Sequence, residues 1–306
     1  MDYCKEMEVA KDFSSILDKE QILFNVPMNE HTSMQVGGKA KVIVLPSSIE
    51  QIKQVLERIY ENNVPCYVMG KGTNLIVRDS GYDGILIMLS HNFSKTKICD
   101  NIITAQSGAS IASISNLACR HSLSGLEFAA GIPGTVGGAV AMNAGAYDGE
   151  MKDVVIEATC INKEGEVFCL SLEELQFGYR TSKIQKQNFF VLEVNMELTP
   201  GIKNQISEKM KLLNNRRREK QPLNLPSSGS IFKRPEGYYA GKLIEDAGLK
   251  GYKIGGAQVS EKHCGFIVNT GTATATDVIE LIEYIKRKVF DNSGVVLQQE
   301  VKILGG

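Results

Sequence analysis

The chain has 306 residues, of which 43% are hydrophobic and 23% are charged. These values are typical of a globular protein with a substantial core, and the length predicts about two domains, or three. Thirty-four basic residues against 35 acidic ones give a net charge of −1, so we expect neither nucleic acid nor a membrane surface as a partner.

Several sequence features predict a cytoplasmic protein. No apolar run approaches the ~18 residues of a membrane-spanning helix, and the N-terminus lacks the apolar core of a signal peptide. The seven cysteines, Cys4 among them, are scattered, odd in number and form no C-x-x-C pair. This pattern indicates reduced thiols rather than disulfides or a zinc site. The four histidines are also far apart, so we expect no metal.

The first part of the chain predicts a β-α-β-β unit. A helix begins after Ser48, with Gln51 at capping-box spacing and an apolar stripe on one face. Strands follow at residues 66–69 and 85–89. The glycine loop 70–74 comes directly after the first of them, at a strand end where α/β proteins usually bind ligands.

The rest of the chain alternates strands and helices, which makes the fold class α+β with a boundary near residue 220. A segment rich in Pro and Ser at 221–230 resembles a linker. The expected strands lie at 102–105, 154–161, 166–170, 189–198, 265–268 and 295–303, and the expected helices at 110 onward, 202–219, 239–247 and 277–290.

Two glycine-rich segments are candidates for a cofactor site. The loop Gly70-Lys71-Gly72-Thr73-Asn74-Leu75 could bring backbone N–H groups close to phosphate oxygens. It fails the dinucleotide fingerprint G-x-G-x-x-G, because Leu75 holds the last position. The segment 131–149 holds six glycines separated by alanines. It suits a backbone folded tightly around a large planar or phosphorylated cofactor, and the alternative is a close-packed turn between strands.

Six segments resemble, in order, the motifs of the UDP-N-acetylenolpyruvoylglucosamine reductase family. Those resembling its cofactor motifs are NEHTSMQVGGKAKVIVLP (29–46), VMGKGTNLIV (68–77) and GIPGTVGGAVAMNAGAY (131–147). Those resembling its catalytic motifs are FGYRTS (177–182), SSGSIFKRP (227–235) and QQEV (298–301). The resemblance implies an FAD-binding fold of the vanillyl-alcohol oxidase (PCMH) type in two subdomains, 1–95 and 96–220. A substrate domain follows at 221–306, whose last strand returns Glu300 to the active site.

The resemblance also implies the reaction and its cofactors. An NADPH-dependent enzyme of this family reduces UDP-N-acetylglucosamine-enolpyruvate to UDP-N-acetylmuramate, a step of peptidoglycan synthesis and hence of cell-wall growth, cell shape and cell division. FAD delivers the hydride, and it is expected to be non-covalent because neither glycine segment contains His or Cys. The expected FAD contacts are Gly70, Lys71, Gly72, Thr73, Asn74, Leu75, Gly131, Ile132, Pro133, Gly134, Thr135, Gly137, Gly138, Asn143, Ala144, Gly145 and Ala146.

Transferring the family's roles places Arg180, Ser230 and Glu300 in the active site. Hydride addition to the alkene spreads negative charge into the substrate carboxylate, which a planar cation such as Arg180 would stabilise. Ser230 then supplies the proton, helped by a nearby charge such as Lys220 or Lys233. Glu300 orients the carboxyl or bonds the enol form, with a raised pKa in the complex.

Substrate contacts follow less directly from the sequence. The chain lacks the insertion in which the family's longer form carries a lid tyrosine, so it resembles the shorter form. The candidates for substrate binding, besides Lys220 and Lys233, are Tyr238, Tyr239, Lys242 and His263. The tyrosines could instead begin a helix and pack on it. The cluster Arg216, Arg217, Arg218 and Lys220 could contact a diphosphate, or could be a solvated helix end.

Two other functions fit parts of the pattern. An FAD oxidase of the same cofactor-domain superfamily would have a different substrate domain and often a His or Cys tethering the flavin. A non-catalytic nucleotide-sugar sensor would not need Arg180, Ser230 and Glu300 together. We therefore expect a reductase that acts as a monomer on small-molecule substrates.

Overall fold

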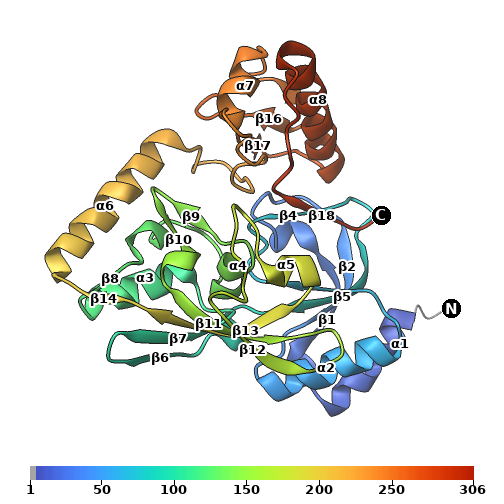
Figure 1. Cartoon of the computed structure of the whole chain (residues 1–306). Coiled ribbons are helices and arrows are strands. Elements are labelled where there is room, and N and C mark those ends of the chain that lie inside the picture. Colours follow the sequence, from blue (N-terminus) through green and yellow to red (C-terminus); the bar gives the residue numbers. More distant parts are fainter. Residues whose placement is uncertain (1–4) are drawn as a thin grey trace. The chain divides into compact units, whose positions relative to one another are not determined.

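The computed structural model describes residues 5–306, so Cys4 lies outside the described residues. The chain forms two compact units (Figure 1). Unit 1 comprises the chain up to Phe24, Val42–Lys71 and Gly84–Arg217. Unit 2 comprises Asn25–Lys41, Gly72–Asp83 and Arg218–Gly306. The expected mixture of helices and strands is confirmed.

The N-terminal elements include a four-stranded sheet in the order β1-β2-β5-β3, and β3 pairs with β5 in parallel. The elements are α1 (Lys5–Asp12), β1 (Ile22–Pro27), β2 (Lys39–Val44), α2 (Ile49–Glu61), β3 (Cys66–Met69) and β5 (Tyr82–Met88). The predicted helix after Ser48 is α2, because the Ser48 hydroxyl accepts the N–H of Gln51 at 3.2 Å. Its apolar stripe is buried at Ile52, Val55, Leu56 and Ile59.

Unit 1 is built on an antiparallel sheet in the order β12-β11-β13-β7-β6. Its strands are β6 (Thr96–Cys99), β7 (Ile102–Gln106), β11 (Val155–Ile161), β12 (Val167–Ser171) and β13 (Phe190–Glu197). The predicted hairpin is therefore confirmed as β11 and β12. Between β7 and β11 come α3 (Ile111–Arg120), β8 (Leu123–Ser124), α4 (Val136–Ala141), β9 (Gly145–Ala146) and β10 (Gly149–Glu150). The short helix α4 packs on β13 and β7, on the side of the sheet where Figure 1 also shows α3.

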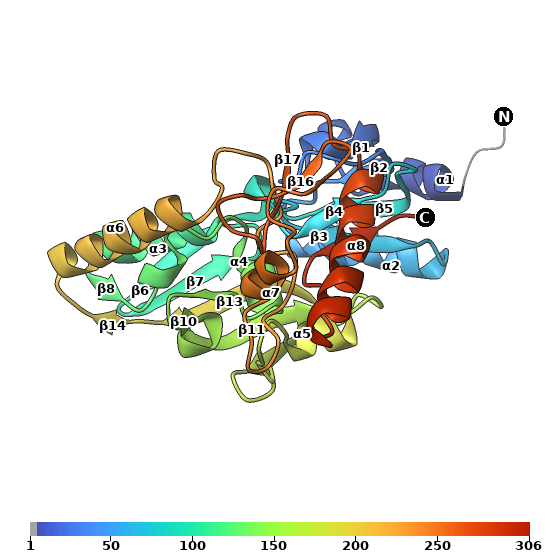
Figure 2. The ribbon, with the colours of Figure 1, turned by 90° about the horizontal axis from the view of Figure 1, so that it is seen from above.

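The helix α6 (Lys203–Lys220) follows α5 (Lys183–Gln187) and β14 (Thr199–Pro200). Both views show it running beside α3 (Figure 2). Glu127, in a 3-10 turn after α3, is only 3% exposed and lies 3.5 Å from the ammonium of Lys209 on α6. Its carboxylate also accepts the Ser124 hydroxyl at 2.6 Å and the Gly125 N–H at 3.1 Å. These contacts attach α6 to the core of unit 1.

Unit 2 carries the last helices and a small antiparallel sheet. Its elements are β4 (Leu75–Val77), α7 (Ala240–Asp246), β15 (Lys253–Ile254), β16 (Ala257–Val259), β17 (Ile267–Asn269), α8 (Ala275–Ser293) and β18 (Lys302–Leu304). Figure 2 shows α7 and α8 side by side. Buried Asn269 donates to the Met34 carbonyl at 3.1 Å and accepts the N–H groups of Gly271 and Ala273. Residues near position 34 therefore belong to this core.

The last strand is shorter than the sequence predicts. A strand over 295–303 was expected, but only Lys302–Leu304 forms one, paired in parallel with β4. Before it, Gln299 bridges to Phe232 and the Glu300 N–H donates to the Ile231 carbonyl at 2.8 Å. The segment changes its partner within a few residues, so no continuous ladder can form.

The described residues offer neither a membrane-spanning helix nor a cluster of metal ligands. None of the helices built from residues 5–306 has the length and apolar composition that crossing a membrane would take. Among the same residues, no three His, Cys, Asp or Glu side chains gather as metal ligands would.

The ion pair of Glu127 predicts a pH-dependent contribution to stability. Burial acts to raise the pKa of Glu127, but hydrogen bonds from Ser124 and Gly125 and the charge of Lys209 outweigh it and lower the pKa. The carboxylate therefore stabilises the fold above the unfolded pKa of about 4.3, and this contribution is lost as pH falls through the lower, folded pKa. Glu127→Gln should reduce the free energy of unfolding by about 1–3 kcal/mol at pH 7.

The measurement is urea unfolding at pH 7 and at acid pH, with exposed Glu208→Gln on α6 as the matched control. The deficit of Glu127→Gln should shrink in acid, while Glu208→Gln should match the parent at both pH values. A deficit of equal size at both pH values would contradict the role given to the carboxylate charge.

Candidate active site

The second glycine-rich segment is folded against the end of β7. Thr135 forms an antiparallel bridge with Ser110. The N–H groups of Val136 and Gly137 donate to the carbonyls of Ala109 and Ser107, each at 2.8 Å. Thr135 then caps α4, since its hydroxyl accepts the Gly138 N–H at 3.4 Å. The segment is thus an ordered part of unit 1.

The first glycine loop begins in unit 1 and continues in unit 2. A Cβ added to Gly70 would lie 2.4 Å from the Thr135 hydroxyl oxygen, so the two glycine segments are in contact within unit 1. Gly72 has φ +62°, and a Cβ there would lie 2.1 Å from the His31 carbonyl in unit 2. The Asn74 amide donates to the Glu300 carbonyl at 3.3 Å, and Leu75 begins β4. Lys71 is exposed and Thr73 is half-buried.

Gly138 differs from its glycine neighbours because the chain itself leaves room for a side chain there. It is exposed on α4, and its Cβ would meet only the Thr135 hydroxyl oxygen, at an ordinary 3.5 Å. At Gly137 a Cβ would come within 2.6 Å of the Ser107 Cβ. Glycine in a helix costs about 0.5–1 kcal/mol relative to alanine. An exposed helical glycine with free space beside it fits a surface approached closely by a ligand.

The other expected cofactor residues of this segment take different positions. Ile132 packs on the core, Pro133 is exposed, Ala144 is buried, and Gly145 and Ala146 form β9. A Cβ added to Gly131 would lie 2.4 Å from the side-chain oxygen of Asn214 on α6. Gly134 has φ +130°, a conformation that favours glycine.

Arg180 stands on a tight turn that is attached to the glycine-rich segment. The turn is closed by the bridge between Gly178 and Thr181, and Arg180 itself has φ +55°. Its guanidinium donates to the Gly145 carbonyl at 2.9 Å and lies 5.5 Å from the Tyr179 ring centre. Left-handed backbone is unusual for arginine, so the surrounding contacts must hold the turn in place.

Asn143 supplies the main contact to this turn. Its side chain is 0% exposed, and its amide donates to the Gly178 carbonyl at 3.2 Å and to the Glu150 carboxylate at 2.9 Å. Its oxygen accepts the Lys152 N–H at 3.0 Å. From the sequence we predict Asn143 as a cofactor contact, and we do not predict that it positions the Arg180 turn. The one available signal is a polar residue, tolerant of positive φ, between apolar neighbours.

The structure brings Ser230 and Glu300 together in unit 2. Ile231, next to Ser230, accepts the Glu300 N–H at 2.8 Å. The Ser230 hydroxyl donates to the Phe232 carbonyl at 3.0 Å, and Ser230 bridges to Phe266. Both side chains are half-buried. Arg180 belongs to unit 1.

Ser230 has a histidine in its neighbourhood. A Cβ added to Gly265 would lie 3.1 Å from His263 Nδ1 and 3.5 Å from Ser230 Oγ. His263 Nδ1 accepts the Gly265 N–H at 3.1 Å, and burial lowers the pKa of the ring. At neutral pH the imidazole is therefore neutral and carries its proton on Nε2.

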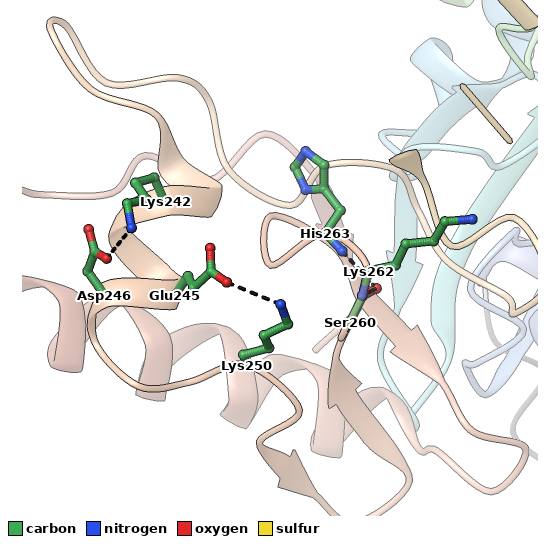
Figure 3. Close-up of polar contacts among 7 residues, drawn as sticks. All are labelled: Lys242, Glu245, Asp246, Lys250, Ser260, Lys262 and His263. Atoms are coloured by element: carbon green, nitrogen blue, oxygen red, sulfur yellow. Dashed lines mark hydrogen bonds and ion pairs between the residues drawn. The ribbon is translucent and has the colours of Figure 1, made fainter. Parts of the chain in front are cut away.

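The remaining substrate candidates do not form one cluster. The Lys242 ammonium points to the Asp246 carboxylate at 2.6 Å, while His263 turns elsewhere (Figure 3). That bond raises the pKa of Lys242. Tyr239 directly precedes α7 as its N-cap, and Tyr238 and Tyr239 are 48% and 64% exposed. Lys220 is exposed and Lys233 is half-buried.

Comparisons with known proteins cover nearly the whole chain. Residues 221–304 match the family described as UDP-N-acetylenolpyruvoylglucosamine reductase, C-terminal domain, and residues 40–171 match the FAD binding domain. The chain is 49% identical over 300 residues to the UDP-N-acetylenolpyruvoylglucosamine reductase of Alkaliphilus oremlandii, covering 98% of this chain and 99% of that protein. The protein of that name from Clostridioides difficile is 49% identical over 291 residues, with 95% and 96% covered.

Solved structures agree with the expected fold. The crystal structure of UDP-N-acetylenolpyruvylglucosamine reductase from Thermus caldophilus has a TM-score of 0.78 and 33% identity, covering 93% of this chain and 98% of that chain. The p-cresol methylhydroxylase structure has a TM-score of 0.50 at 15% identity, covering 64% of this chain and 44% of that chain. The latter similarity concerns the fold alone, and it confirms the predicted type of FAD-binding fold.

The space beside Gly138 provides a test of cofactor contact. Gly138→Ala should leave the thermal stability of the FAD-free protein unchanged or slightly higher, because alanine favours the helix. Its flavin-to-protein absorbance ratio should fall, and Gly138→Val should give colourless protein. The matched variant Gly137→Ala should instead lose stability, because its Cβ would collide with Ser107. A parental flavin ratio in both Gly138 variants would exclude this contact.

Proposed function

The chain belongs to the UDP-N-acetylenolpyruvoylglucosamine reductase family, and from that premise we propose that it reduces UDP-N-acetylglucosamine-enolpyruvate to UDP-N-acetylmuramate with NADPH. It is an FAD-dependent oxidoreductase of peptidoglycan synthesis. The observation that carries the proposal is 49% identity over 98% of the chain. The same length of match weighs against an oxidase with another substrate domain and against a sensor that has lost the chemistry.

The glycine-rich residues on both sides of the contact between Gly70 and Thr135 would hold FAD. Exposed Gly138 offers backbone without a covering side chain, and the buried Ser107 hydroxyl beneath Gly137 has no hydrogen-bond partner within the described residues. These features suit a large group lying against the segment. When bound, FAD supplies the hydride.

Arg180 would stabilise the negative charge that develops on the substrate carboxylate. A guanidinium presents planar paired donors that match a carboxylate in two points. The guanidinium should be held in position before the reaction, because a donor that must reorganise during the reaction stabilises the developing charge less. The Gly145 carbonyl and the turn held by Asn143 provide that fixing.

Ser230 would donate the proton to the second alkene carbon, and Glu300 would hold the substrate carboxyl or the enol form. The Ser230 hydroxyl is a rotor that now donates to the Phe232 carbonyl, and it needs only to turn to face a substrate. The Glu300 N–H is bonded to the carbonyl of Ile231, the neighbour of Ser230, so the two residues could act on one substrate. Lys220 or Lys233 would assist the proton transfer by its charge.

Further features of the protein stay proposals of the same kind. FAD-binding parts at 1–95 and 96–220 and a substrate part at 221–306 follow from the resemblance. A monomeric state is an expectation, and Tyr238, Tyr239, Lys242 and His263 are candidates for substrate contacts in place of the missing lid tyrosine. A cytoplasmic location is supported by the cysteines of residues 5–306, which are free thiols.

Non-covalent FAD predicts that the yellow colour can be separated from the chain. Acid denaturation should release the flavin into the supernatant, because no His or Cys lies in either glycine segment to form a bond. Absorbance of the supernatant and of the redissolved pellet measures the split. Colour that stays with the pellet would favour the oxidase.

The function itself is tested by the two half-reactions, followed anaerobically by stopped-flow. NADPH should bleach the flavin band of the parent, and UDP-N-acetylglucosamine-enolpyruvate should restore it. In Ser230→Ala the bleaching should stay nearly normal, while reoxidation should slow by about 10²–10⁴-fold, the usual contribution of a positioned proton donor. Glu300→Gln and Arg180→Lys should show the same asymmetry.

One contrary outcome would reject the assigned residue roles, and another would reject the function. Equal slowing of both half-reactions in these variants would mean distorted flavin binding and would reject the assigned roles. A parent protein that NADPH reduces but the sugar cannot reoxidise would reject the function.

A further inference from the structure

The segment that carries Glu300 changes its hydrogen-bonding partner directly after that residue. Up to Glu300, residues 298–300 pair with residues 231–233 of unit 2. From Lys302 onward the chain pairs with β4. Val301 lies between the two pairings. The direction of the backbone at Glu300 is therefore not set by one continuous ladder, and another contact has to fix it.

The side chain of Gln299 supplies such a contact. Its amide nitrogen donates to the Val301 carbonyl at 2.7 Å, so the side chain reaches across Glu300 to the residue beyond it. Val301 is only 2% exposed, and a buried carbonyl left without a donor is costly. The bond closes a short loop of chain that has Glu300 at its centre.

The ammonium of Lys286, on α8, determines which way round this amide lies. It donates to the side-chain oxygen of Gln299 at 3.3 Å. Because an ammonium can only donate and a backbone carbonyl can only accept, the amide oxygen must face Lys286 and the nitrogen must face Val301. Glutamine offers both functions in one uncharged side chain, whereas an ionised glutamate would present acceptors alone. Lys286 also forms an exposed ion pair with Glu283 at 2.6 Å.

We propose that Gln299 is a positioning residue, which fixes the backbone at Glu300 so that the carboxyl group meets the substrate, and that Lys286 keeps the Gln299 amide in the required orientation. The inference rests on the proposed function, which gives Glu300 its task at the substrate carboxyl or the enol form. A group that acts on developing charge contributes most when it is fixed beforehand, and a displacement of about 1 Å can lower a rate by about 10²-fold.

The test uses Gln299→Met, because methionine keeps the length of the side chain and cannot donate to the Val301 carbonyl. In anaerobic stopped-flow on the purified flavoprotein, bleaching by NADPH should stay normal, while reoxidation by UDP-N-acetylglucosamine-enolpyruvate should slow by about tenfold or more. Lys286→Met should slow reoxidation by a smaller factor, and Lys286→Arg should stay close to the parent. The control Glu283→Gln, which removes only the other partner of Lys286, should match the parent.

A double variant separates positioning from stability. In the Glu300→Gln background, Gln299→Met should cause little further slowing of reoxidation, because the place of a carboxyl group no longer matters once that group is gone. A residue that only stabilised the fold would slow reoxidation by the same factor in both backgrounds. Lys286→Met, which leaves the bond from Gln299 to Val301 possible, allows the same comparison if Gln299→Met cannot be purified.

Three results would overturn the proposal. Parental reoxidation in Gln299→Met, with Glu300→Gln slow, would reject the positioning role and leave the proposed function intact. Equal factors in both backgrounds, or equal slowing of both half-reactions with a lower thermal midpoint, would make Gln299 a structural residue. Parental reoxidation in Glu300→Gln would reject the task given to Glu300, and this inference with it.

Discussion

The amide of Asn143 joins three segments of unit 1 at a point with no access to water. It donates to the Gly178 carbonyl and to Glu150, and it accepts from the Lys152 N–H. A buried amide left without partners is costly, so these segments stabilise one another through Asn143. The Arg180 turn is one of them, and its left-handed backbone is unusual for arginine. The position of the guanidinium thus depends on a residue 37 positions earlier in the sequence, within the glycine-rich segment.

The glycines of the two glycine-rich segments mostly serve the packing of the chain on itself. Side chains at Gly70, Gly131 and Gly137 would strike Thr135, Asn214 and Ser107, respectively. A glycine-dense sequence was interpreted as a backbone wrapped around a cofactor, with a close-packed turn as the alternative. Both interpretations hold for different glycines. Most of them allow chain segments to pack closely together, whereas a side chain at Gly138 would meet only the Thr135 hydroxyl, at an ordinary contact distance.

Elements with a strong local signal were predicted well from the sequence. The cap at Ser48, the strand β3 and the hairpin β11–β12 lie where periodicity and turn residues indicated. The short strand β4 was missed, because it is defined by its pairing with β18, more than 200 residues away in the sequence. The same reason explains the shortened terminal strand. Assignment of residues 25–41 to unit 2 rests on contacts such as Asn269 with Met34, which no local pattern reports.

The three residues expected to act on the substrate are held by their backbones more than by their side chains. Arg180 sits on a closed turn, Ser230 bridges to Phe266, and Glu300 is bonded through both its N–H and its carbonyl. A change of side chain at any of them therefore leaves the local framework bonded. The guanidinium of Arg180 also bonds the Gly145 carbonyl, and the Ser230 hydroxyl bonds the Phe232 carbonyl, so these two side chains also contribute to the local structure. Asn143 is the opposite case, because its side chain is itself the framework.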